Sequence, residues 1–111
     1  MIIAVDYDGT LVNGGKLDHA LIDALRARQR RGDTVILWTC REGKRLQEAL
    51  RTLQSAGFRP QLVNANAPAA TRMLGYDPRK IYADLYIDDK GAAAWILQQR
   101  HGSASSESCE K

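Results

Sequence analysis

The sequence contains little cysteine, few aromatic residues and no long apolar run. Only two cysteines occur, Cys40 and Cys109, and their wide separation excludes a disulfide framework or a zinc site built on paired cysteines. No segment approaches the ~20 apolar residues that a membrane-spanning helix needs. Met1 leads directly into an apolar, strand-like run, which is not the pattern of a cleaved signal peptide. We therefore expect a cytoplasmic protein that makes no contact with membranes.

The short length and the modest charge narrow the choice further. A chain of 111 residues corresponds to one domain and leaves no room for a second, inserted domain. The net charge of +3 suits an acidic or phosphorylated partner but is too small to establish nucleic-acid binding. We expect a single domain over residues 1–100. Residues 101–111 are polar, with no large apolar side chain to anchor them, and are predicted to be a disordered tail.

Apolar runs alternate with amphipathic segments along the chain. Runs rich in β-branched residues at 2–6 and 34–38 are typical of strands buried on both faces, 61–64 predicts a short third strand and 83–87 a fourth strand. Helices are expected from Asp18 to Gly32, around Leu46 to Gly57, and over residues 91–100. This alternation predicts an α/β fold, a small doubly wound, Rossmann-like parallel sheet with helices on both faces. Ligands of such sheets bind beyond the carboxyl ends of the strands.

Polar residues gather just after three of the expected strands. They are Asp6, Asp8 and Thr10 after the first strand, Thr39 and Arg41 after the second, and Asp88 and Asp89 after the fourth. If the second and fourth strands flank the first, these side chains meet in one crevice. Four carboxylates in one crevice repel each other unless a cation lies among them, and oxygen ligands alone select a hard ion such as Mg²⁺. The sequence therefore predicts a magnesium site.

The same residues carry a family resemblance. The stretches DYDGTL at 6–11, ILWT at 36–39 and ADLYIDD at 83–89, with Lys80 ahead of the last, resemble the four motifs of the haloacid dehalogenase superfamily of aspartate-nucleophile phosphatases. The match extends from residue 2 to about residue 90, and the absence of a cap domain is similar to a small capless subgroup. The resemblance implies a haloacid dehalogenase-like fold and hydrolysis of phosphomonoesters.

The resemblance also implies roles for the acidic residues. Asp6 would be the nucleophile that forms an aspartyl-phosphate. Asp8 would protonate the leaving oxygen and then deprotonate the water that clears the intermediate. The carboxylates of Asp6 and Asp88 and the backbone carbonyl of Asp8 would hold Mg²⁺, with Asp89 as a ligand directly or through water.

Four further residues receive roles at the phosphate. Thr39 and Lys80 would bind the non-bridging phosphoryl oxygens, although the adjacent Arg79 could take the place of Lys80. Thr10 is expected to orient the Asp6–Asp8 loop by a local side-chain-to-backbone hydrogen bond, or alternatively to touch substrate. Arg41 is expected to contact substrate.

Three functions remain open at this stage. The leading hypothesis is a Mg²⁺-dependent phosphatase for a small phosphorylated metabolite, with a homo-oligomer completing the site. The second is a phosphatase for nucleic-acid ends or phosphoproteins, which the basic charge and the capless site favour. The third is a non-catalytic phosphate-binding or assembly module, against which the presence of both Asp6 and Asp8 argues.

Overall fold

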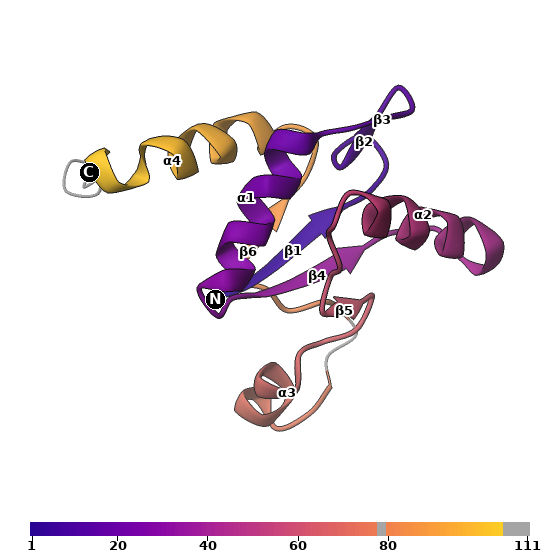
Figure 1. Cartoon of the computed structure of the whole chain (residues 1–111). Helices are drawn as coiled ribbons and strands as arrows, with labels where there is room; N and C mark the ends of the chain where they lie inside the picture. The colour runs from indigo at the N-terminus through magenta and orange to yellow at the C-terminus, as the bar shows by residue number, and fades with distance from the viewer. Residues whose placement is uncertain (78–79, 106–111) are drawn as a thin grey trace.

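A four-stranded parallel sheet forms the centre of the protein, seen here in a computed structural model that describes residues 1–77 and 80–105 (Figure 1). Its strand order is β5-β4-β1-β6, with bounds β1 (Ile2–Asp6), β4 (Thr34–Trp38), β5 (Leu62–Val63) and β6 (Leu85–Ile87). Strand β1 pairs with β4 along its whole length and with β6 on its other side. The expected parallel sheet is confirmed, and the second and fourth predicted strands do flank the first.

Four helices flank the sheet, which makes the fold a small Rossmann-like, doubly wound α/β domain. They are α1 (His19–Arg30), α2 (Gly43–Ser55), α3 (Pro68–Leu74) and α4 (Ala92–Ser105). Helix α1 begins as predicted, because the Asp18 carboxylate accepts a hydrogen bond of 3.0 Å from the Leu21 N–H. Helix α4 continues to Ser105, so residues 101–105 of the predicted tail are helical, whereas the rest of that tail, including Cys109, lies outside the described residues. None of the helices described is both long and apolar enough to cross a membrane.

Three of the helices pack on the same face of the sheet. The alternating residues of β1 and β4 that point to this face join apolar side chains of α1, α2 and α4 in one buried cluster, whose members include Ile3, Val5, Val35, Leu37, Leu21, Ile22, Leu25, Leu53 and Trp95. These residues are the ones that the apolar runs and the helix periodicity mark. The main core therefore lies between the sheet and these three helices.

The other face of the sheet is covered differently. The connections from β1 to β4 and from β4 to β5 step in one direction, whereas the connection from β5 to β6 runs back past β1. Right-handed crossovers therefore place α3 on the opposite face from α1 and α2. On this face Ala4 and Ile36 are fully buried, but Trp38 and Tyr86 are each 50% exposed. The reversal of direction beside β1 creates the crevice where such folds bind ligands.

Two local elements were not predicted. A hairpin of β2 (Val12–Asn13) and β3 (Lys16–Leu17) follows β1, and α3 occupies a segment for which no helix was expected. The hairpin turns through Gly14 and Gly15, whose φ angles of 57° and 78° lie in the left-handed region that favours glycine. Strands of two residues are too short to produce an alternating pattern, which explains why the sequence did not indicate them.

Candidate active site

The predicted site residues lie around the carboxyl end of β1. Asp6 is the last residue of this strand, and it pairs in register with Trp38, the last residue of β4. A cavity of about 210 Å³ opens at this point and is lined by Asp6, Trp38, Thr39 and Cys40. The structure thus brings the expected nucleophile and one expected phosphate ligand, Thr39, to the same cavity.

The environment of Asp6 raises the pKa of its carboxyl group. Burial is the largest cause, and the negative charges of Asp8, Asp89 and Asp88 add to it, against a lowering effect of the hydrogen bond from the Tyr7 N–H. That N–H donates to Oδ1 of Asp6 at 2.8 Å. The three other aspartates predicted as one group with Asp6 are therefore near enough for their charges to act on it.

Arg41 forms a bidentate ion pair with Asp8. The guanidinium donates from Nε to Oδ2 and from Nη2 to Oδ1 of Asp8, each at 2.9 Å. Hydrogen bonds from Arg41 are the main reason why the pKa of Asp8 is lowered; the charges of Arg41 and Arg45 act in the same direction, and burial acts against them. The guanidinium also lies 4.8 Å from the centre of the buried Tyr7 ring. Arg41, predicted to contact substrate, thus contacts the expected acid/base residue.

Thr39 is fixed by Asn64, a residue that the sequence analysis missed. Oδ1 of Asn64 accepts from the Thr39 N–H, and its Nδ2 donates to the Thr39 carbonyl, both at 2.9 Å. The Thr39 hydroxyl in turn accepts from the Arg41 N–H at 3.1 Å. Asn64 has a φ of 50°, a left-handed conformation that asparagine tolerates better than most residues. The one sequence feature that could have identified Asn64 is its position directly after the short strand β5 (Leu62–Val63).

The expectation for Thr10 is wrong in its favoured form. The Thr10 side chain is 1% exposed, and its hydroxyl has no hydrogen-bond partner within the part of the chain that the structure describes. The turn that follows Asp6 is instead held by backbone bonds, from Gly9 N–H to the Val12 carbonyl at 2.8 Å and from Val12 N–H to the Tyr7 carbonyl at 3.0 Å. Because the backbone closes this loop by itself, the threonine hydroxyl is not needed to orient it.

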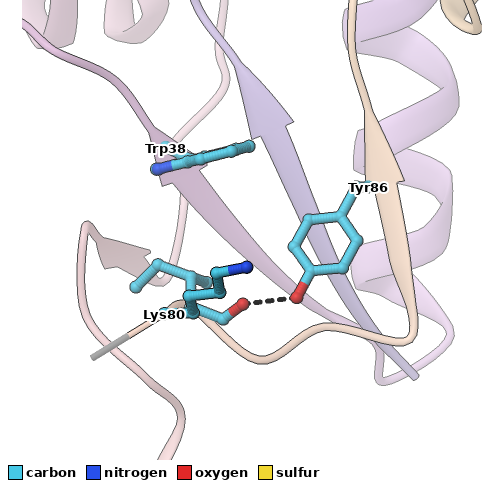
Figure 2. Close-up of a pocket in the computed structure, with 4 residues that line it drawn as sticks. Trp38, Lys80 and Tyr86 are labelled. Carbon is cyan, nitrogen blue, oxygen red and sulfur yellow. Dashed lines mark hydrogen bonds between the residues drawn. The ribbon is translucent and has the colours of Figure 1, made fainter. Parts of the chain in front are cut away.

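Lys80 lies beside a second cavity rather than in the one that contains Asp6. This cavity measures about 480 Å³ and is lined by Trp38, Lys80, Ile81 and Tyr86 (Figure 2). Asn66 holds the backbone here, because its Nδ2 donates to the Lys80 carbonyl at 3.2 Å and its Oδ1 accepts from the Tyr82 N–H at 2.6 Å. Arg79, the alternative to Lys80, lies outside the described residues. Trp38 lines both cavities.

The acidic residues fit a magnesium ion by their chemistry. Across residues 1–77 and 80–105, the side chains of no three His, Cys, Asp or Glu residues converge in a metal-binding arrangement. The expected set, however, needs only the Asp6 and Asp88 carboxylates beside a backbone carbonyl. Asp88 uses Oδ1 to accept from the Lys90 and Gly91 N–H groups at 3.1 Å, at the start of α4. The donors are all oxygens, and a cation would offset the charge repulsion that, next to burial, raises the pKa of Asp6.

Comparisons with known proteins bear on the fold and on kinship. No model of a known protein family matches this chain, and no curated protein matches it. The chain is similar to a solved structure, that of a conserved protein coded by a locus from Bacteroides thetaiotaomicron. The two are 30% identical, the match covers 93% of this chain and 91% of that one, and the TM-score is 0.69.

Proposed function

This chain belongs to the same family as the conserved Bacteroides thetaiotaomicron protein, and we propose that it is a Mg²⁺-dependent phosphatase of the haloacid dehalogenase type. Its substrate in this proposal is a small phosphorylated metabolite. The observation that supports it best is the position of Asp6, which ends strand β1 and lines a cavity with Thr39. Besides burial, the charges of three further aspartates raise the pKa of Asp6. Such a concentration of acidic groups costs stability, and groups with pKa values shifted in this way are found most often at functional sites.

The proposed reaction has two steps, both on this chain's own residues. In the first, an oxygen of Asp6 attacks phosphorus, the ester P–O bond breaks, and Asp8 donates a proton to the departing oxygen. In the second, Asp8 removes a proton from water, the water oxygen attacks the aspartyl-phosphate, and inorganic phosphate leaves. Asp6 is then free as a carboxylate for the next cycle.

The negative charge of the phosphoryl group needs compensation in both steps. The Thr39 turn, fixed by Asn64, lies in the Asp6 cavity, where it is positioned to bind a phosphoryl oxygen. Lys80 brings a positive charge from the adjoining cavity. The Asp6 and Asp88 carboxylates and the Asp8 carbonyl, with Asp89 directly or through water, would hold Mg²⁺, which would supply the remaining positive charge.

The ion pair between Arg41 and Asp8 favours the second step, in which Asp8 acts as a base, and opposes the first, in which Asp8 acts as an acid. Asp8 must be protonated to assist the leaving oxygen, yet Arg41 lowers the pKa of Asp8 and favours the carboxylate. A phosphate that attracts the guanidinium would release Asp8 and allow its pKa to rise. We therefore assign Arg41 a double role, to bind substrate and to make Asp8 a better acid once substrate is present.

The direct test is hydrolysis of p-nitrophenyl phosphate by the purified protein, with Mg²⁺ and with the metal removed. We expect turnover that requires Mg²⁺ and that falls by at least about a thousandfold in Asp6→Asn, which lacks the nucleophile. Asp23→Asn, at an exposed aspartate of α1, is the matched control and should keep wild-type activity. Metal-independent turnover, or full activity in Asp6→Asn, would contradict the proposal.

A further inference from the structure

The second cavity has the size and lining of a small-molecule site. Its volume of about 480 Å³ lies within the ~300–1,000 Å³ that is usual for such sites. Two aromatic rings, an isoleucine and a lysine form its walls. Neither the nucleophile nor Thr39 lines it, so phosphoryl transfer at Asp6 gives a role to Lys80 but none to Trp38, Ile81 and Tyr86 in this cavity.

The two rings stand on the same face of the sheet, on either side of the central strand. Trp38 is paired with Asp6, and Tyr86 is paired with Ala4, two residues before Asp6 on β1. Since residues i and i+2 of a strand point to one face, Asp6 and both rings point the same way. The ring centres are 6.1 Å apart and the ring planes make an angle of 66°.

Hydrogen bonds hold the Tyr86 ring at the cavity. Its hydroxyl donates to the Ile81 carbonyl and accepts from the Ala83 N–H at 3.1 Å, as the dashed line in Figure 2 shows for the first of these. Tyr86 nevertheless remains 50% exposed, as does Trp38. An exposed ring that is fixed in place presents a flat apolar surface, and a ligand binds it at little cost in side-chain entropy.

Lys80 adds a positive charge to the cavity. In Figure 2 the ammonium group of Lys80 points toward the space between the two rings. Trp38 forms the common wall with the Asp6 cavity. A ligand with a flat ring against Trp38 and Tyr86 can therefore extend a phosphate past Lys80 to the expected nucleophile.

We infer that the cavity formed by Trp38, Tyr86, Ile81 and Lys80 binds a flat heterocyclic ring of the substrate, of the nucleobase kind, while the phosphate reacts at Asp6. The inference rests on the proposed function, because it identifies the part of the phosphomonoester that leaves. Stacking of a base on an aromatic side chain contributes enough to binding that loss of the ring costs about tenfold or more in affinity. The substrate class is then a nucleotide, either free or at the end of a strand.

Ring binding can be measured without turnover. The chain has two tryptophans, and Trp95→Phe leaves Trp38 as the fluorescent one. In the Asp6→Asn, Trp95→Phe protein, a nucleoside monophosphate should quench Trp38 and bind at least about tenfold more tightly than ribose 5-phosphate, which competes for the same site without a base. Equal affinities of the two ligands would overturn the inference.

Kinetics with ring variants form the second arm. Tyr86→Leu should lower kcat/KM for a nucleoside monophosphate by about tenfold, mainly through KM, and leave kcat/KM for ribose 5-phosphate unchanged. Tyr86→Phe, which keeps the ring, should retain the preference for the nucleotide. The exposed Tyr76 does not line the cavity, so Tyr76→Leu is the matched control and should behave as wild type. A uniform effect of Tyr86→Leu on both substrates would contradict the inference.

The two arms separate this inference from the proposed function. If the nucleotide quenches Trp38 but no phosphomonoester is hydrolysed, the proposed function is wrong and the ring site stands. If both phosphates are hydrolysed equally well and Tyr86→Leu changes neither, the ring site is wrong and the phosphatase stands. A phosphorylated dinucleotide tested beside the mononucleotide identifies the source of the ring, and either preference supports the site.

Discussion

Arg41 donates two hydrogen bonds of 2.9 Å to the carboxylate of Asp8. This ion pair controls the charge state of Asp8, the expected general acid. Arg41→Gln removes the hydrogen bonds and the charge that lower the pKa of Asp8, so that pKa rises. Because Asp8 must be protonated for the first step, the basic limb of the pH profile of kcat/KM should move to higher pH. KM should rise as well, since the substrate loses a cationic contact.

The control for this prediction is Arg45→Gln. The charge of Arg45 is the smallest of the causes acting on Asp8, so the basic limb should move less than in Arg41→Gln. A basic limb that stays in place in Arg41→Gln, or moves to lower pH, would show that Asp8 is not the group that donates the proton.

Asn64 is predicted to support the Thr39 turn from a distance of 25 residues along the chain. Asn64→Ala removes both hydrogen bonds to the Thr39 backbone and places alanine at a left-handed φ, so we expect a loss of about 2 kcal/mol in the free energy of unfolding and a lower kcat. Asn64→Asp can still accept from the Thr39 N–H but cannot donate to its carbonyl, and should lie between. Urea unfolding and kinetics test this order, and equal stability of the three proteins would refute it.

Removing the hydroxyl group from each of two buried threonines should change the stability of the protein in different ways. Thr10→Val removes a hydroxyl that has no partner among the described residues, and should leave stability unchanged or raise it by about 1 kcal/mol. Thr39→Val removes the acceptor for the Arg41 N–H and should lower stability by about 1 kcal/mol. Thermal or urea unfolding of both variants decides the matter. A destabilised Thr10→Val would mean that its hydroxyl has a partner.

Asp33 links the start of β1 to α1 and makes stability depend on pH. It accepts from Arg28 Nε at 2.6 Å and from the Met1 ammonium at 3.0 Å. Burial alone would raise the pKa of Asp33, but the hydrogen bonds and charges of these two partners outweigh it and lower the pKa. The stabilising effect is therefore complete above the unfolded-state pKa of about 3.9 and is lost as pH falls through the lower folded-state pKa.

Asp33→Asn should accordingly lower the free energy of unfolding by about 1 kcal/mol at neutral pH, since the pair is partly exposed. The difference from wild type should shrink to zero in acid, as the wild-type carboxyl becomes protonated. Urea unfolding at several pH values measures this, with Asp23→Asn as a control that should change little at any pH. A difference that stays constant down to strong acid would rule out the ion pair as its source.

The sequence predicted those features that leave a local pattern. The β-branched runs of β1 and β4 and the Asp18 cap of α1 were expected and are confirmed. The hairpin β2–β3 and α3 were missed because strands of two residues and a helix of seven are too short to show a period.

The residues of the candidate site also fall into those that the sequence predicted and those that it missed. Asp6 and Thr39 were found because Asp6 ends one strand and Thr39 follows another, and parallel strands bring such residues to one edge. Asn64 and Asn66 were missed, because their contacts reach across many residues to backbone groups and produce no spacing in the sequence. Lys80 was expected at the phosphate; it lines the aromatic cavity, a placement that depends on the course of the loop before β6 and that the sequence alone did not indicate.

The measurement that tests the central claim most directly is the capture of a phosphoryl group on Asp6. Asp8→Asn is the suitable protein, because p-nitrophenolate leaves without a proton while the water that clears the intermediate still requires Asp8. After mixing with p-nitrophenyl phosphate and Mg²⁺ and an acid quench, we predict one p-nitrophenolate released rapidly per protein and a phosphoryl group on the peptide that contains Asp6. Release without any phosphorylated Asp6, at the same rate in the Asp6→Asn, Asp8→Asn double variant, would contradict the account.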